Sequence, residues 1–312
     1  MEKNSKIYVA GHRGLVGNAT VNALKRHGYA NIIGRTHSEL DLMDQKQVKE
    51  FFETEKPEYV VLAAARAGGI RESIAHPTEF MLENLKIQNN VIWQAYQSGV
   101  KKLLFLGSSC IYPRECPQPM KEEYLLTGPL EPTNEGYAIA KIAGLKLCEY
   151  MHDQFDANFI SCMPCNIYGE GDYFDTERGH VIGSLMVRMH TAKIENTPEV
   201  AIWGTGNARR EFLFTDDLSE AIVFFLEHYN EKQFLNVGTG EDISIKDLAQ
   251  LMKETVSYQG NLTFDTSKPD GMPQKLMDVS KLKALGWEPK VTLKEGLQKS
   301  YRDYLQTLEK NL

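Results

Sequence analysis

The chain has 312 residues, 42% of them hydrophobic, and a formal net charge of −7, which is an ordinary composition for a globular protein. It has no dense stripe of lysine and arginine and no apolar run of the roughly 20 residues that a membrane span needs, which argues against nucleic-acid binding and membrane insertion. The five cysteines are odd in number and irregularly spaced, which argues against a disulfide framework or a zinc site, so we expect a cytoplasmic protein without a metal.

The first predicted element is a short strand at residues 6–10, followed at once by the loop Gly11-His12-Arg13-Gly14-Leu15-Val16-Gly17. A helical pattern covers residues 15–27 and ends at Gly28, and a second strand is predicted at residues 31–34. Glycines in such a βαβ turn let the backbone approach a pyrophosphate, whose charge the helix N-terminus stabilises. We therefore expect the loop to bind a dinucleotide through Gly11, Arg13, Gly14, Leu15, Val16 and Gly17.

The residue after the second strand indicates which dinucleotide is bound. NAD sites usually place an acidic residue there to hold the ribose hydroxyl groups, whereas this chain has Arg35. Arg13, within the glycine loop, supplies a second guanidinium group. Because guanidinium groups form charge-assisted hydrogen bonds with phosphate, the two arginines predict NADP(H) as the cofactor.

Strand and helix patterns continue to alternate up to Tyr168. Helices are predicted at residues 45–55, 79–97 and 137–154, and strands at residues 59–64, 102–106 and 158–163. This alternation predicts an α/β fold in which a Rossmann-type parallel sheet has helices on both faces. After Tyr168 the rhythm breaks: helices at residues 181–192, 217–229, 245–256 and 293–308 are separated by short strands at residues 200–203, 234–237 and 262–264. We expect residues 1–168 to form an NADP-binding domain and residues 169–312 to form mainly a smaller substrate-binding lobe, with some segments returning to the main sheet.

Three polar residues near the middle of the chain indicate catalysis. Tyr137 and Lys141 are four residues apart and share one helical face, so we expect the Lys141 ammonium to lower the pKa of the Tyr137 phenol. Such a phenol can transfer a proton to or from a carbonyl oxygen. Ser108 follows the strand at residues 102–106, at the edge where open parallel sheets bind ligands, and can hydrogen-bond the same oxygen. Taken singly, the pair also fits a solvated helix face, and the serine a turn.

The glycine loop, Ser108 and Tyr137-x-x-x-Lys141 together resemble the extended short-chain dehydrogenase/reductase family, and the resemblance covers essentially the whole chain. The other segments that carry it are Gly68-Gly69-Ile70, Gly107-Ser108-Ser109-Cys110-Ile111-Tyr112-Pro113, Pro164-Cys165-Asn166-Ile167-Tyr168-Gly169, Trp203-Gly204-Thr205-Gly206, Arg210-Glu211-Phe212-Leu213, Asn236-Val237-Gly238-Thr239-Gly240 and Lys268-Pro269-Asp270-Gly271. The resemblance implies an NADPH-dependent 3,5-epimerase/4-reductase of GDP-4-keto-6-deoxy-mannose, which binds the GDP-linked sugar in the C-terminal lobe.

The resemblance also implies roles for individual residues. Ser108, Tyr137 and Lys141 match the reductase triad, while Cys110 matches an epimerisation base and His180 its partner acid. Taken singly, Cys110 is better explained as a small buried residue and His180 as a loop histidine that caps the following helix. The residues matched at the nicotinamide end of the cofactor are Lys141, Asn166 and His180, and those matched around the GDP-sugar are Arg188, Trp203, Arg210 and Asp270.

Several alternatives stay open. The same chemistry could act on a GDP-4-keto-6-deoxy-heptose, with or without epimerisation; other classes are an epimerase or dehydratase that recycles bound NAD and a non-catalytic NADPH sensor. Cys165 stands where the family more often has threonine, and Arg66 is a second departure that we consider a candidate substrate contact. The helices at residues 79–97 and 137–154 are candidates for pairing two chains into a homodimer.

Overall fold

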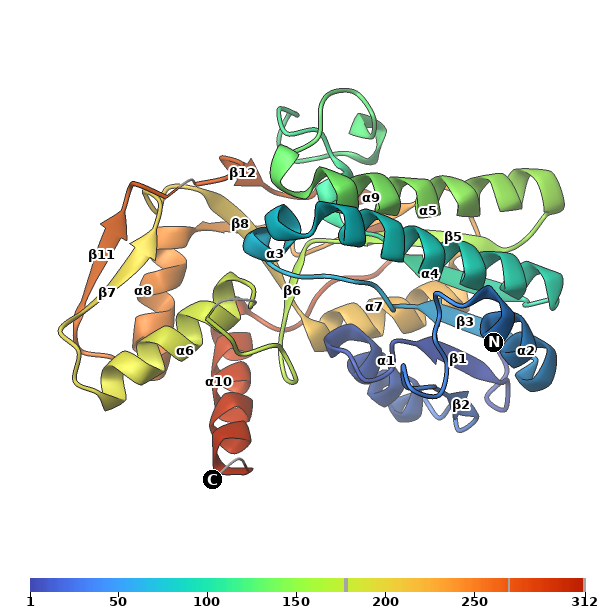
Figure 1. Cartoon of the computed structure of the whole chain (residues 1–312), viewed down its shortest axis with the longest axis horizontal. Coiled ribbons are helices and arrows are strands. Elements are labelled where there is room, and N and C mark those ends of the chain that lie inside the picture. The colour runs from blue at the N-terminus through green and yellow to red at the C-terminus, as the bar shows by residue number, and fades with distance from the viewer. Residues whose placement is uncertain (177–178, 269, 311–312) are drawn as a thin grey trace.

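The computed structural model describes residues 1–176, 179–268 and 270–310, and its largest sheet has six parallel strands (Figure 1). Their order is β2 (Ile32–Ile33), β1 (Ile7–Ala10), β3 (Tyr59–Leu62), β4 (Lys102–Leu106), β5 (Phe159–Pro164) and β9 (Leu235–Val237). In the register, Ile7 lies opposite Tyr59 and Ala10 opposite Leu62. Because β2 and β3 lie on opposite sides of β1, the sheet has a topological switch point between the carboxyl ends of β1 and β3, where such sheets bind ligands.

Helices cover both faces of this sheet, which confirms the predicted fold class. α1 (Leu15–Arg26) and α7 (Thr215–His228) pack together on one face, and α2 (Gln45–Glu55), α4 (Pro77–Gln97) and α5 (Glu135–Phe155) cover the other (Figure 1). With both faces covered, every residue of β1, β4 and β5 is buried, so these strands are mostly apolar in the sequence, with Lys102 and Ser161 as buried polar exceptions. Although α4 and α5 each have 21 residues, no helix in the described ranges is long and apolar enough to cross a membrane.

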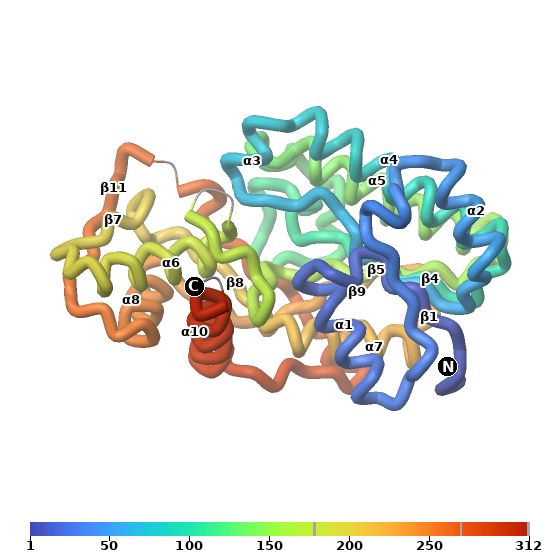
Figure 2. Tube along the Cα trace, turned by 60° about the horizontal axis from the view of Figure 1, so that its bottom comes forward, coloured from blue at the N-terminus to red at the C-terminus, as the bar shows by residue number. Residues whose placement is uncertain are grey.

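A second hydrophobic core lies in what we call the C-terminal lobe, formed by α6, α8, α10, β6–β8 and β10–β12. Its helices are α6 (Val181–Ile194), α8 (Ile245–Val256) and α10 (Leu293–Lys310), which stand to one side of the main sheet (Figure 1, Figure 2). β8 (Arg209–Phe214) pairs with β6 (Asn166–Tyr168), β10 (Asp242–Ser244) and β12 (Gln274–Lys275), and β7 (Glu199–Trp203) pairs with β11 (Asn261–Asp265). Between these elements the chain returns to the main sheet as α7 and β9.

Every predicted helix and strand forms, with ends within two residues of the prediction. The helix α2 begins at the predicted residue because the Asp44 carboxylate accepts hydrogen bonds from the main-chain N–H groups of Lys46 and Gln47 at its first turn. The sequence pattern did not predict β6, β8, β10, β12, α3 (Ile70–Ala75), α9 (Ser280–Ala284) and the 3₁₀ turns η1 (Ser109–Ile111), η2 (Glu122–Tyr124) and η3 (Pro132–Asn134). Most of these are too short to show a periodicity. They matter for function because several of them line the cavity described next.

Candidate active site

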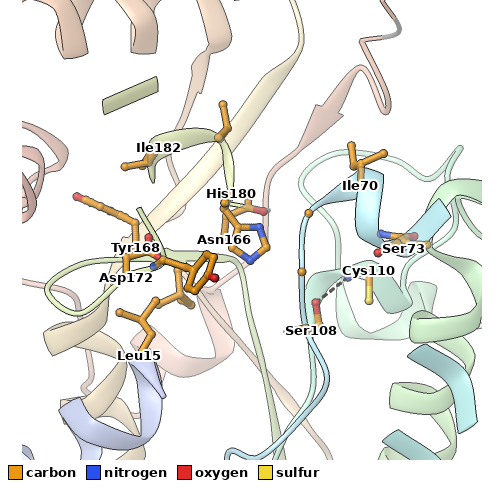
Figure 3. A pocket seen from close by; sticks show the side chains of 18 of the residues that line it. Leu15, Ile70, Ser73, Ser108, Cys110, Asn166, Tyr168, Asp172, His180 and Ile182 are labelled. Carbon is orange, nitrogen blue, oxygen red and sulfur yellow. Dashed lines mark hydrogen bonds between the residues drawn. The ribbon is translucent and has the colours of Figure 1, made fainter. Parts of the chain in front are cut away.

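A cavity of about 1250 Å³ lies between the carboxyl edge of the main sheet and the C-terminal lobe (Figure 3). The loops after β1, β3 and β4 line one part of it, and residues of α6, β7, β8 and β12 line another. The predicted site residues that line this cavity are Gly11, Arg13, Gly14, Leu15, Val16, Gly17, Ser108, Cys110, Tyr137, Lys141, Asn166, His180, Arg188, Trp203, Arg210 and Asp270. Residues spread over most of the chain are thus gathered around one space.

The glycine-rich segment at residues 11–17, which joins β1 to the first turn of α1, accepts only glycine at two of its positions. Gly11 has a φ of +85°, and a Cβ there would lie 2.8 Å from the main-chain nitrogen of Ala64. A Cβ on Gly17 would lie 2.0 Å from the carbonyl oxygen of Gly11. The N-cap residue of α1 is Gly14, which has no side chain to accept a hydrogen bond from the first main-chain N–H groups of the helix. These residues fit a dinucleotide pyrophosphate, which binds to such N–H groups.

Tyr137 and Lys141 lie on the first turns of α5, as their spacing predicts. The Lys141 Nζ is 5.7 Å from the centre of the Tyr137 ring and donates a hydrogen bond to the Leu106 carbonyl oxygen at 2.8 Å. Burial raises the pKa of Tyr137 above its ordinary value and lowers the pKa of Lys141 to about 8. The prediction of a lowered pKa for the phenol is therefore wrong for this structure, because removal from water, and after it the neighbouring Cys110, raise the pKa of Tyr137.

Ser108 and Cys110 follow β4 in the turn η1. The Ser108 Oγ accepts a hydrogen bond from the Cys110 main-chain N–H at 3.4 Å (Figure 3). Cys110 is 5% exposed, and burial raises the pKa of its thiol. Three neighbours lower the pKa of this thiol: Lys275 has the largest effect, followed by Ser108 and Lys141. Burial thus disfavours the thiolate form of Cys110, whereas these three neighbours favour it.

His180 precedes α6 and lies across the cavity from Cys110. Figure 3 shows His180, Asn166 and Asp172 along one wall, with Ser108 and Cys110 on the facing wall. Burial raises the pKa of the Asp172 carboxyl, and the nearby His180 acts against this rise. The Asn166 side chain donates to the Glu211 carbonyl oxygen at 2.8 Å, which orients its carboxamide. A thiol and an imidazole therefore face the same space from two sides.

The part of the cavity within the C-terminal lobe is lined by guanidinium groups and an aromatic ring. Arg188, on α6, donates to the Ala201 carbonyl oxygen, and Arg210, on β8, donates to that of Asp270 at 3.3 Å. Burial lowers the pKa of both arginines. Trp203, at the end of β7, is 42% exposed and offers its ring to the cavity. The Asp270 carboxylate already accepts hydrogen bonds from the main chain and hydroxyl of Thr205.

Two arginines singled out in the sequence lie outside the cavity lining that the described residues form. Arg35 donates to the Gly34 carbonyl oxygen at 2.9 Å and forms an ion pair with Glu55. Arg66 forms an ion pair with Glu83 at 2.8 Å and stacks over the Phe80 ring at 5.3 Å. Arg66 is therefore held away from the substrate space, whereas Arg13 lies within the cavity lining.

Glu131 and Lys275 are among the charged residues of the site that sequence reasoning missed. Glu131 is 7% exposed and precedes η3; its Oε1 accepts a hydrogen bond from the Thr133 hydroxyl, and its Oε2 lies 3.5 Å from the Arg114 Nε. Lys275 is the last residue of β12 and lies beside Arg210 in the register of that strand. Both line the cavity. Neither has a sequence signal, because each enters through an element too short for a periodic pattern.

A glycine cradle at the switch point of a parallel sheet is typical of proteins that bind a dinucleotide, and here the cavity continues from it into a second lobe with space for another ligand. The comparison with known families agrees with this class. Residues 7–238 match the NAD dependent epimerase/dehydratase family, and the chain belongs to this family of enzymes that bind a nucleotide cofactor.

Individual relatives extend over the full length of the chain. It is 53% identical to GDP-L-fucose synthase 1 of Arabidopsis thaliana over 307 residues, which cover 98% of this chain and 95% of that protein. Among solved structures, it resembles a GDP-6-OMe-4-keto-L-xylo-heptose reductase from C. jejuni, with a TM-score of 0.94, 38% identity and coverage of 98% and 99% of the two chains. It also resembles MlghC, a GDP-mannoheptose C4 reductase from Campylobacter jejuni with NADP bound, with a TM-score of 0.90, 40% identity and the same coverage.

Proposed function

We propose that the protein is an NADPH-dependent 3,5-epimerase/4-reductase that converts GDP-4-keto-6-deoxy-D-mannose to GDP-L-fucose. The observation that carries this proposal is a single cavity lined by Ser108, Tyr137 and Lys141 and also by Cys110 and His180, so that one bound sugar can meet both sets of residues. The 53% identity to a full-length GDP-L-fucose synthase supports the choice of substrate.

A second candidate is a C4-reductase, with or without epimerisation, of a related GDP-4-keto-6-deoxy-heptose. The similarity to two reductases of GDP-linked heptoses, at 38% and 40% identity, favours it. The higher identity to the fucose synthase makes the hexose our first choice. An epimerase or dehydratase that recycles bound NAD has less support, because Arg35 stands where such an enzyme favours an acidic residue.

In the proposed reduction, Tyr137 supplies the proton and Ser108 orients the substrate oxygen. NADPH, when bound at the glycine cradle, supplies the hydride for C4 of the keto sugar. Because burial raises the pKa of Tyr137, the phenol keeps its proton until an alkoxide, which is a stronger base than a phenolate, develops at the C4 oxygen. The Ser108 hydroxyl donates a hydrogen bond to that oxygen, and the Lys141 ammonium stabilises the phenolate that remains.

In the proposed epimerisation, Cys110 removes a proton and His180 returns one from the opposite side. The C4 ketone makes the hydrogens at C3 and C5 acidic, because the enolate formed by their loss delocalises its charge onto the C4 oxygen. Ser108 and Tyr137 can stabilise that oxygen as a small oxyanion hole. The facing positions of Cys110 and His180 in Figure 3 support inversion, which requires proton removal and return on opposite faces of the sugar ring. The charge of Lys275 favours the thiolate form of Cys110.

For substrate binding, we propose that the C-terminal lobe holds the GDP part. Trp203 offers a ring face to guanine, while Arg188 and Arg210 suit the diphosphate. Asp270 helps to build this end of the cavity through its hydrogen bonds with Thr205. Residues 1–168 then bind mainly NADP and residues 169–312 mainly the sugar nucleotide, with His180 reaching the nicotinamide end from the second part.

Incubation of the enzyme with NADPH and GDP-4-keto-6-deoxy-D-mannose, followed by NMR of the product, tests the function. We expect GDP-L-fucose. A parallel incubation with the corresponding GDP-4-keto-6-deoxy-heptose tests the second candidate. Two outcomes would contradict the proposed dual activity. One is that neither sugar supports NADPH oxidation, and the other is a hexose product with unchanged configuration at C3 and C5.

The preference for NADPH is tested by Arg35→Glu. Charge reversal removes a guanidinium group from the proposed 2′-phosphate site, so we expect KM for NADPH to rise about tenfold or more, as loss of a charge-assisted hydrogen bond predicts, with little change for NADH. Arg26→Glu is a matched control, because Arg26 also forms an ion pair with a glutamate, Glu220, but lies at the far end of α1. An unchanged ratio of the two KM values in Arg35→Glu would leave Arg13 as the arginine that recognises the phosphate.

We further propose that the enzyme works in the cytoplasm, which is consistent with its five free thiols.

We also propose that the enzyme forms a homodimer through α4 and α5. Apolar side chains lie exposed on these neighbouring helices, including Trp93 at 42% and Tyr150 at 62%. We expect sedimentation to give twice the 35.4 kDa mass of one chain, and Trp93→Glu with Tyr150→Glu to give monomers. The control Ile194→Glu places a charge on another exposed apolar residue, on α6, and should leave the dimer intact. A monomeric wild-type enzyme would contradict the proposal.

A further inference from the structure

Arg71 links the two sides of the cavity opening. It is the second residue of α3, a short helix that follows β3 and lies at the end of the main sheet that faces the C-terminal lobe (Figure 1, Figure 2). Its guanidinium carbon lies 4.1 Å from the centre of the Trp203 ring, which belongs to β7 of that lobe. Both residues line the cavity and both are exposed. The contact therefore spans the open side of the cavity.

The charges around Trp203 indicate what this opening can bind. Arg188 lines the same part of the cavity, and the positive charge of Arg71 contributes to the lowered pKa of Arg188. Arg210 lines the cavity as well, so three guanidinium groups border one space beside an indole ring. Arg71 and Arg188 repel each other, and an anion with several oxygens relieves that repulsion through charge-assisted hydrogen bonds. Near Arg210, the Asp270 and Glu131 carboxylates already act against the effect of burial on its pKa. A nucleoside diphosphate combines such an anion with a planar ring that can stack on an indole.

Arg66, five residues before Arg71, lies in the same segment after β3. It shows that a position in this segment does not by itself bring a guanidinium group to the cavity. Arg66 is paired with Glu83 and stacked on Phe80, outside the cavity lining that the described residues form. Arg71, on α3 after the N-cap residue Gly69, instead lines the cavity. The two side chains thus provide a comparison within one segment of the chain.

We propose that Arg71 is a further substrate-binding residue, which contacts the diphosphate of the GDP-sugar from the main-sheet side while Trp203 stacks on the base from the C-terminal lobe. This inference rests on the proposed function and extends it by a residue that comes from the dinucleotide-binding half of the chain. Arg71 closes the opening over the nucleotide and takes no part in proton transfer. Loss of the Arg71 side chain weakens substrate binding but does not lower the rate at which bound substrate reacts.

Calorimetric titration with GDP tests the inference without requiring turnover. We expect Arg71→Ala to raise the Kd for GDP about tenfold, as the loss of a charge-assisted contact predicts, and Arg71→Lys to have a smaller effect because the charge remains. Guanosine, which has no phosphate, should bind the Arg71→Ala variant nearly as well as the wild type. Arg66→Ala is the matched control and should leave the Kd for GDP unchanged. Unchanged NADPH affinity in each variant shows that it is folded.

Steady-state kinetics provides a second measurement. Arg71→Ala should raise KM for the GDP-keto-sugar about tenfold at unchanged kcat, which is the pattern expected when binding is lost equally from substrate and transition state. A Kd for GDP within twofold of wild type, or a wild-type protein that does not bind GDP, would overturn the inference. If wild type binds GDP but does not convert the keto-sugar, the proposed function fails, and the comparison of Arg71→Ala with Arg66→Ala still decides the role of Arg71.

Discussion

Tyr137→Phe should lower the rate of NADPH oxidation by roughly a hundredfold to ten-thousandfold, the range expected for loss of a general acid, without weakening NADPH binding. Phenylalanine preserves the ring, which packs edge-on against Phe80 at 6.2 Å between centres, so the substitution removes only the hydroxyl group. The variant therefore lacks the proton source that the proposed mechanism places beside the C4 alkoxide. The measurement is the loss of NADPH absorbance in single turnovers with saturating keto-sugar.

A matched control for this substitution is Tyr168→Phe. Tyr168 lines the same cavity and also has a buried hydroxyl, but that hydroxyl donates to the Leu293 carbonyl oxygen at 3.3 Å, so its role is structural. Its removal should cost about 1 kcal/mol of stability, the usual value for a hydrogen bond, and leave the turnover rate near that of wild type. If Tyr137→Phe oxidised NADPH as fast as Tyr168→Phe, the phenol would have no place in the reduction.

The main sheet was predictable from the sequence because its strands are buried on both faces and its helices are long. In contrast, β8 was missed because Arg209, Arg210 and Glu211 are an unusual start for a largely buried strand. Glu211 is fully buried, its carboxylate accepts hydrogen bonds from the main chain of Gly240 and Met277, and burial raises its pKa to about 7. Those partners come from distant segments, so no local pattern reports them.

The sequence predicted which residues form the candidate site better than it predicted the direction of their pKa shifts. Spacing placed Tyr137 and Lys141 on one helical face, but it carries no information on how deeply the pair is buried, and burial determines the direction of both pKa shifts. The same holds for Cys110. The neighbour that lowers its pKa most strongly, Lys275, is far away in the sequence. Arg71 reaches the cavity on a six-residue helix that has too few turns to be recognised.

Cys110→Ser should slow the exchange of deuterium into C3 and C5 by roughly a hundredfold or more, because a serine hydroxyl does not ionise at accessible pH and so supplies no anionic base in place of the thiolate. Hydride transfer should be affected much less, since Ser108, Tyr137 and Lys141 remain in place. NMR of the sugar in deuterated buffer measures the exchange, and NADPH absorbance measures the reduction. The prediction is thus a separation of two rates in one variant, which a general loss of folding cannot produce.

The control and the pH dependence decide whether the thiol is the base. Cys165→Ser changes another buried thiol that lines the cavity and should leave both rates near those of wild type. Because burial raises the pKa of Cys110 above its ordinary value of 9.0, the thiolate fraction increases with pH, so wild-type exchange should still be rising at pH 9. Cys110→Ser should lack this rise. Equal slowing of exchange and reduction in Cys110→Ser would instead mean that Cys110 supports the structure of the site, and the inversion of C3 and C5 would need a different base.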